Sequence, residues 1–183
     1  MAELIAISPC AGLLPKDIGH LTIDEVDVSD AVVVAPFAGR TKEVSAALKE
    51  QLGIAFPGAN RSTSKGHARA IWFGAGQALI MSQETPDVGN LAAVTAQGDG
   101  LAAVTVSGED ALEVLARLVP IDLRAASFKR GHTARSLVNH MTATITRIAA
   151  DRFEIITMRS MAQTLVSELE EAALSVKARR ETT

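Results

Sequence analysis

Two glycine-containing loops are the first places where residue types and spacing could bind a phosphate or a nucleotide. Gly58-Ala-Asn-Arg-Ser-Thr-Ser-Lys65 resembles a phosphate-binding loop, but Ser64 stands where that motif requires a glycine, and no helix is expected after Lys65. Gly74-Ala-Gly76 lacks the third glycine and the following helix of a dinucleotide-binding motif. A hairpin turn explains both of its glycines without a ligand. Neither loop therefore predicts a nucleotide site.

The sequence contains no recognisable set of residues for covalent catalysis, acid–base catalysis or metal binding. Cys10 is the single cysteine and lies beside no candidate base, and no serine lies in a Gly-x-Ser-x-Gly motif. The four histidines follow no metal-ligand spacing. Asp99, Asp122 and Asp151 lie in turns or at helix ends, where capping or solvation explains them. We therefore expect no catalytic, cofactor-binding or metal-binding residue in this chain.

Three long polar side chains stand within or beside runs of strand-forming residues. Arg135, His140 and Arg159 have threonine, isoleucine and other apolar neighbours that strand alternation would half-bury. Each of the three side chains needs a hydrogen-bonding partner. That partner is either internal, or water on an exposed sheet face, or another subunit, because arginine is common in protein interfaces.

Composition narrows the class of protein. The chain has 183 residues, 48% hydrophobic residues, a formal net charge of −3 and 3% aromatic residues, which predict one core, in one or two lobes, and argue against nucleic-acid binding. No basic leader precedes an apolar run, and no apolar stretch is long enough to cross a bilayer. With a single cysteine, these features predict a cytoplasmic protein without membrane contact.

Residues 1–30 are predicted to form an N-terminal arm. They mix short apolar pieces with Pro9, Pro15 and an acidic run at 24–27, and they show neither a helical nor a strand period. Such an arm is either disordered in the isolated chain or ordered across a partner. The sequence leaves both states open.

Residues 31–183 are predicted to form a single α+β domain, with helices packed on antiparallel sheet. A strand is expected at 31–36 and a polar loop at 58–67. The predicted hairpins pair 70–73 with 78–81, the repeated Leu-Ala-Ala-Val-Thr segments 91–95 with 101–105, and 133–148 with 153–158. The predicted helices run from a Thr41 cap to Gly53, from a Ser107 cap to Pro120, and from the capping box Ser160-Met-Ala-Gln163 along the stripe Leu165, Leu169, Ala172, Ala173 and Val176.

Six motifs in series resemble the gamma subunit family of heterotetrameric sarcosine oxidase. They are Val34-Ala-Pro-Phe-Ala-Gly39, Arg69-Ala-Ile-Trp-Phe-Gly74, Val94-Thr-Ala-Gln-Gly-Asp-Gly100, Pro120-Ile-Asp-Leu123, Ala134-Arg-Ser-Leu-Val-Asn-His140 and Met158-Arg-Ser-Met-Ala162. The resemblance covers the chain from about residue 31 to the last helix. On these motifs the candidate subunit contacts are Arg69, Trp72, Arg135, His140 and Arg159.

The resemblance implies a fold similar to part of the folate-binding T protein of the glycine cleavage system. It also implies three partners: a large alpha subunit with flavin and NAD, a beta subunit with flavin, and a small zinc-binding delta subunit. The complex would use FAD, FMN, NAD, tetrahydrofolate and zinc, all on those subunits. It would oxidise the N-methyl group of sarcosine and pass the one-carbon unit to tetrahydrofolate, with this chain as a non-catalytic assembly component.

Two departures from the related patterns bear on that implication. The T-protein family has an acidic residue just before a strand, whereas the matching stretch here, 138–147, has no carboxylate. The Thr-Asp-Gln-Ser-Asp pattern of the gamma family is Thr95-Ala-Gln-Gly-Asp99 in this chain. Three alternatives stay open: a subunit of an N-methylglutamate dehydrogenase complex, a stand-alone folate-binding or one-carbon transferase-like protein, and a regulatory domain that binds folate without turnover.

Overall fold

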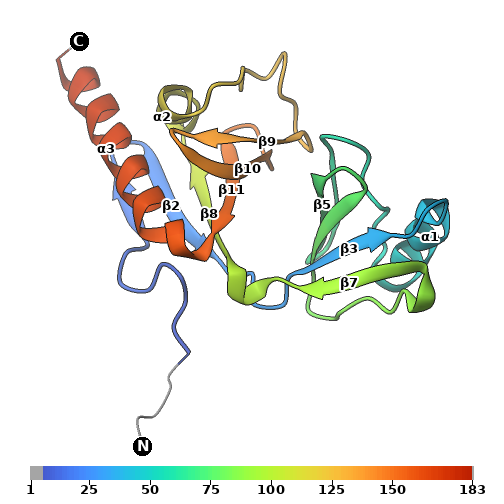
Figure 1. Ribbon diagram of the computed structural model, residues 1–183. Helices are drawn as coiled ribbons and strands as arrows, with labels where there is room; N and C mark the ends of the chain where they lie inside the picture. Colours follow the sequence, from blue (N-terminus) through green and yellow to red (C-terminus); the bar gives the residue numbers. More distant parts are fainter. Residues whose placement is uncertain (1–5, 183) are drawn as a thin grey trace, which may run out of the picture.

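The computed structural model describes residues 6–182, and they form the expected α+β fold with antiparallel sheets. Its helices are α1 (Thr41–Leu52), α2 (Ala111–Leu118) and α3 (Ala162–Glu181), with short 3₁₀ turns η1 (Gly89–Leu91), η2 (Gly98–Gly100) and η3 (Arg159–Met161). Its strands are β1 (Lys16–Ile18), β2 (Leu21–Val26), β3 (Val32–Pro36), β4 (Ser62–Lys65), β5 (Ala68–Gly74), β6 (Gln77–Met81), β7 (Ala92–Ala96), β8 (Leu101–Ser107), β9 (Thr133–Val138), β10 (Met141–Arg147) and β11 (Arg152–Met158). The strands divide into two sheets (Figure 1).

The large sheet has six strands in the order β1-β2-β8-β11-β10-β9. One of its faces packs against α2 and α3, and α3 lies along the outer side of this half of the molecule (Figure 1). The apolar stripe expected on the last helix is buried there, as Leu165, Leu169 and Val176 show. The predicted hairpin of β10 with β11 is confirmed, and β9 adds a further hairpin through a turn at Asn139 and His140.

The small sheet has five strands in the order β4-β5-β6-β3-β7 and packs one face against α1. Val44 and Leu48 are the buried residues of that helix. The helix ends at Gly53, whose φ of 71° is a left-handed conformation that suits glycine. The expected cap at Thr41 is wrong by one position, because Arg40 is the cap residue and makes no side-chain cap hydrogen bond.

A third apolar cluster joins the two sheets. It lies on the face of each sheet that points away from the helices, because alternate residues of a strand point to opposite faces. We call this contact the seam. The large sheet contributes Leu101, Ala103 and Ile156 to it, and the small sheet contributes Ile71, Leu79 and Met81.

The expectation of an N-terminal arm without helix or strand is wrong for residues 16–26. These residues form β1 and β2, and β2 pairs with the central strand β8. Leu21 and Ile23 are buried, so the strand has an inward face, which the acidic run 24–27 at its end obscured in the sequence. The predicted polar loop 58–67 likewise contains β4, which pairs with β5. Residues 1–5 of the predicted arm lie outside the described part of the chain.

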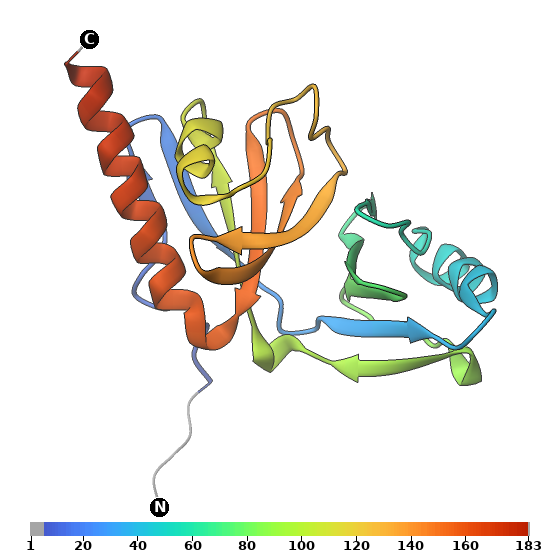
Figure 2. The same ribbon diagram turned by 45° about the horizontal axis from the view of Figure 1, so that its top comes forward.

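The two Leu-Ala-Ala-Val-Thr segments do not form the predicted hairpin. The first copy enters β7 of the small sheet, and the second starts β8 of the large sheet. Between them, η2 packs closely against the backbone at Ser29, since a Cβ on Gly98 would lie 1.9 Å from the carbonyl oxygen of Ser29. The link therefore carries the chain from one sheet to the other. Figure 2 shows β3 and β7 running side by side away from the large sheet.

Candidate functional site

At the seam, charged side chains from the two sheets meet in a largely buried setting. On β5, Arg69, Ile71 and Phe73 share one face by strand alternation, and Ile71 lies in the seam cluster. On β11, Glu154 and Ile156 share the opposing face. The sequence thus places one cation and one carboxylate on facing strands that are far apart along the chain.

Arg69 and Glu154 form an ion pair across the seam. The Glu154 side chain is 1% exposed and the Arg69 side chain is 22% exposed. Burial raises the pKa of Glu154, and the nearby Arg69 opposes that rise. The Glu154 Oε1 atom has no hydrogen-bond partner in the described residues, so the carboxylate depends on Arg69 through Oε2. This pair ties the small sheet to the large one.

A second arginine crosses the seam near its other end. Arg135 on β9 donates a hydrogen bond from Nη1 to the carbonyl oxygen of Phe73, at 2.6 Å. Its guanidinium also lies over the Phe73 ring, 4.8 Å from the ring centroid, which is cation–π geometry. The internal partner considered in the sequence analysis is therefore present for Arg135.

The other sequence-predicted contact residues lie elsewhere. Trp72 is half-buried on β5, on the same face as Ala70, which packs toward α1. His140 is exposed in the turn between β9 and β10. Arg159 is exposed in η3 and donates a hydrogen bond to the carbonyl oxygen of Ile7. The structure therefore brings Arg69 and Arg135 to the seam, and the role of all five residues as subunit contacts stays a prediction.

Open cavities flank the Arg69 side chain. One of about 330 Å³ is lined by residues that include Asp27, His67 and Ser82, and another of about 250 Å³ is lined by residues that include Ser62 and Arg130. Both include Arg69 in their lining. The larger cavity is lined by two acidic residues, Asp27 and Asp30, whereas the smaller one has arginine side chains and serine hydroxyls and no carboxylate among the described residues of its lining, which suits recognition of an anionic or polar group. The buried carboxylate of the seam is already paired with Arg69, so the arrangement favours binding over acid–base chemistry.

Three buried charged residues, Asp110, Arg147 and Glu154, escaped the sequence reasoning, and Asp110 is paired with Arg180. Glu154 interrupts an apolar strand run, and its alternation with Ile156 was a usable signal for burial. Arg147 is also buried; it donates to the carbonyl oxygens of Ala150 and Leu123, and its guanidinium lies 4.5 Å from the Phe153 ring centroid. Burial lowers the pKa of Arg147. Its contacts fasten the loop after α2 to the large sheet, a structural role.

Cys10 is fully buried and lies beside a carboxylate. Its backbone N–H donates to Glu25 Oε1 at 2.8 Å. Burial, with the charge and hydrogen bond of Glu25, raises the pKa of the thiol to about 11. The thiol is therefore protonated at neutral pH and is a poor nucleophile. Within residues 6–182, no group of three or more His, Cys, Asp or Glu residues is placed to hold a metal ion.

No protein-family model and no curated protein sequence matches this chain. None of the helices in the described residues is long and apolar enough to cross a membrane. Among solved structures, a chain of the heterotetrameric sarcosine oxidase from Corynebacterium sp. U-96, in complex with pyrrole 2-carboxylate, superposes with a TM-score of 0.79 at 17% sequence identity. The match covers 94% of this chain and 96% of that chain. This protein therefore has the fold of one chain of a heterotetrameric sarcosine oxidase.

Proposed function

We propose that this chain is the gamma-type subunit of a heterotetrameric sarcosine oxidase-like complex and that its role is assembly. The observation that carries the proposal is the structural match, with a TM-score of 0.79 over almost the full length of both chains. Coverage of 94% and 96% makes the two chains nearly equal in length. That equality favours equivalence with a whole subunit over likeness to one domain of a larger subunit.

The six motifs in series support the gamma assignment within such a complex. Two of them provide the arginines of the seam, namely Arg69 in Arg69-Ala-Ile-Trp-Phe-Gly74 and Arg135 in Ala134-Arg-Ser-Leu-Val-Asn-His140. Both arginines join the two sheets, which gives these two motifs a structural role that needs no catalysis. We also propose that the fold is similar to part of the glycine-cleavage T protein.

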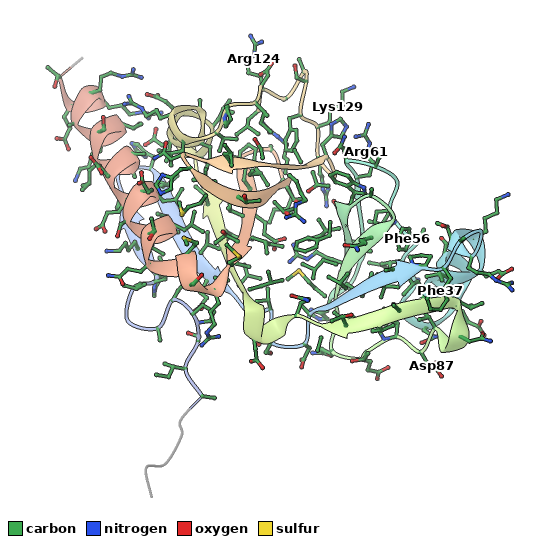
Figure 3. All side chains as sticks on the ribbon, viewed as in Figure 1. Phe37, Phe56, Arg61, Asp87, Arg124 and Lys129 are labelled. Carbon is green, nitrogen blue, oxygen red and sulfur yellow. The ribbon has the colours of Figure 1, made fainter. Side chains whose placement is uncertain are left out.

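An assembly role is supported by surfaces that a self-sufficient domain would cover. Strand β7 is an edge strand of the small sheet, it has no charged residue, and its Val94 is 39% exposed. Phe37, which follows β3, is 52% exposed. Figure 3 shows Phe37 on the part of the small sheet remote from the large one. An uncharged edge strand with apolar neighbours favours contact with another chain.

In this proposal the chemistry belongs to the partner subunits. The alpha, beta and delta subunits would carry FAD, FMN, NAD, tetrahydrofolate and zinc, and the complex would oxidise sarcosine in the cytoplasm and transfer the one-carbon unit to tetrahydrofolate. This chain would bind none of these groups. The buried seam carboxylate of Glu154 is already engaged by Arg69, which supports a structural use of that residue.

The test is to tag this chain in its native host, purify it gently and record the native mass and the visible spectrum. We expect larger chains in fixed stoichiometry and the absorption bands of bound flavin. A chain that arrives alone and colourless contradicts the proposal, and titration of the isolated chain with tetrahydrofolate then tests the folate-binding alternative. Turnover of N-methylglutamate in place of sarcosine by the purified complex would assign it to the dehydrogenase class.

A further inference from the structure

Positive charge is segregated along the sequence. Segments 54–83 and 123–150 together contain eight of the 18 lysine and arginine residues and none of the 21 aspartate and glutamate residues. The rest of the chain is therefore acidic on balance, although the overall formal charge is only −3. The net charge of the whole chain does not show this segregation. A surface rich in one sign of charge favours a partner of the opposite sign.

The structure places these two acid-free segments side by side. An isolated antiparallel bridge joins Arg61 to His132. The Ser62 N–H donates to the carbonyl oxygen of Gly131 at 2.8 Å, and the Thr133 N–H donates to the carbonyl oxygen of Asn60 at 3.1 Å. Figure 3 shows Arg61, Lys129 and Arg124 along one side of the molecule, over both sheets. Cations from distant parts of the sequence thus share one face.

We call Arg61, Lys129 and Arg130 the basic edge. All three side chains are exposed, and none forms an ion pair within the described residues. Cations elsewhere are often paired, as in Lys16–Glu170, Arg40–Glu43 and Arg180–Asp110. The basic edge therefore holds positive charge that no carboxylate of the described chain neutralises.

His132 lies close to two cations of the basic edge, Arg61 and Lys129. Burial lowers the pKa of His132, and the charges of Arg61 and Lys129 lower it further. Beside the edge lies the cavity of about 250 Å³, to which Ser62, Ser64 and Arg130 contribute. Arginine guanidinium groups and serine hydroxyls next to a concave surface are suited to receive carboxylates.

We propose that the basic edge is a docking surface for an acidic face of a partner protein in the complex. The inference rests on the proposed function, since it names the surface by which this subunit binds. A protein fits better than a nucleic acid, because the chain has no tyrosine and 3% aromatic residues, and Phe128 beside the edge is buried. The three cations without ion pairs form a small group, which suits a patch of carboxylates on a protein better than the long phosphate backbone of a nucleic acid.

The experiment compares two doubly substituted chains in the complex purified from the native host. Arg61→Glu/Arg130→Glu reverses two charges of the basic edge, and Lys42→Glu/Lys49→Glu reverses two exposed charges on α1 and changes the net charge equally. Circular dichroism and thermal unfolding first establish that both variants fold. The measured quantity is the amount of partner chain recovered per tagged chain at physiological ionic strength.

We expect the basic-edge variant to lose at least about tenfold in partner recovery, because juxtaposed like charges oppose association, and the α1 variant to retain it. Equal recovery with both variants overturns the docking surface while leaving the proposed function intact. A wild-type chain that brings no partner overturns both. Co-purifying nucleic acid that is removed by nuclease and lost in the basic-edge variant overturns the protein partner.

Discussion

The segment Leu-Ala-Ala-Val-Thr occurs twice, and the two copies occupy opposite environments. In the copy at 101–105 every residue is buried, and Val104 is 0% exposed. In the copy at 91–95 only Ala92 is buried, and Val94 is 39% exposed. The same five residues therefore form a core strand in one sheet and an exposed edge strand in the other.

The difference comes from the neighbours that each copy meets. Strand β8 lies between β2 and β11, with α2 and α3 over one face and the seam over the other. Strand β7 pairs with β3 alone. Strand propensity depends strongly on such context, so an identical local sequence has no fixed contribution to stability. The large sheet is expected to dominate folding, and the outer edge of the small sheet remains available for contact with another chain.

The largest expected effect comes from placing a charge in each copy. Val104→Asp buries a carboxylate without a partner, and we expect a loss of more than about 4 kcal/mol, enough to prevent folding. Val94→Asp is the matched control and should change the free energy of unfolding by less than about 0.5 kcal/mol. Urea denaturation followed by circular dichroism measures both. Equal losses in the two variants would break the comparison.

A substitution at the seam tests whether the stability of the chain depends on the ion pair between the two sheets. Arg69→Met leaves the Glu154 carboxylate buried and unpaired, and we expect a loss of about 3 kcal/mol in the free energy of unfolding. Arg61→Met is the control, because Arg61 is exposed and has no ion pair in residues 6–182; its effect should be within about 0.5 kcal/mol. Similar stabilities for the two variants would show that the sheets do not depend on the ion pair.

A pH series sharpens the role of Glu154. Burial raises the pKa of this carboxyl in the folded chain above its ordinary value of 4.5. The folded chain therefore holds the proton more tightly than the unfolded chain, and the resulting stabilisation is full below about pH 4.5 and is lost as pH rises through the folded pKa. Glu154→Gln removes this titration.

We expect the free energy of unfolding of the wild type, relative to Glu154→Gln, to decrease as pH rises above about 4.5. Urea unfolding of both proteins across the acid to neutral range measures that difference. A difference that is constant with pH, or that increases, contradicts the assignment of a raised pKa to this residue.

The smallest expected effect is at the other end of the seam. Arg135→Ala removes the hydrogen bond to the Phe73 carbonyl and the cation–π contact, and we expect a loss of about 1 kcal/mol. Arg130→Ala removes an exposed arginine without an ion pair in the described chain and serves as the control, with little change expected. A loss at Arg130 as large as at Arg135 would mean that these contacts add no stability.

Local patterns predicted the elements whose burial is decided within the element. Helix α1 begins and ends close to Thr41 and Gly53, and the stripe from Leu165 to Val176 on α3 is buried as expected. The hairpins of β5 with β6 and of β10 with β11 also follow from their turn residues and strand-forming runs. In these cases periodicity and turn chemistry carry enough information.

Pairings between distant segments could not be predicted in the same way. Strand β2 was not predicted because Asp24 and Glu25 within it, with Asp27 just after it, resemble a solvated run, while its partner β8 lies far along the chain. The two Leu-Ala-Ala-Val-Thr copies lie in different sheets because each pairs with strands that are distant in the sequence. Arg69 was singled out without a partner, because Glu154 lies 85 residues away and pairs with it only in the folded chain.

The most direct test of the assembly role is the native mass of the flavin-containing chains from a host that lacks this protein. If the chain is an assembly subunit, those chains should run below the mass of the full complex, and adding back the purified protein should restore that mass. Flavin-containing chains that reach the full mass without this protein, or that never bind it when it is added, would contradict the account.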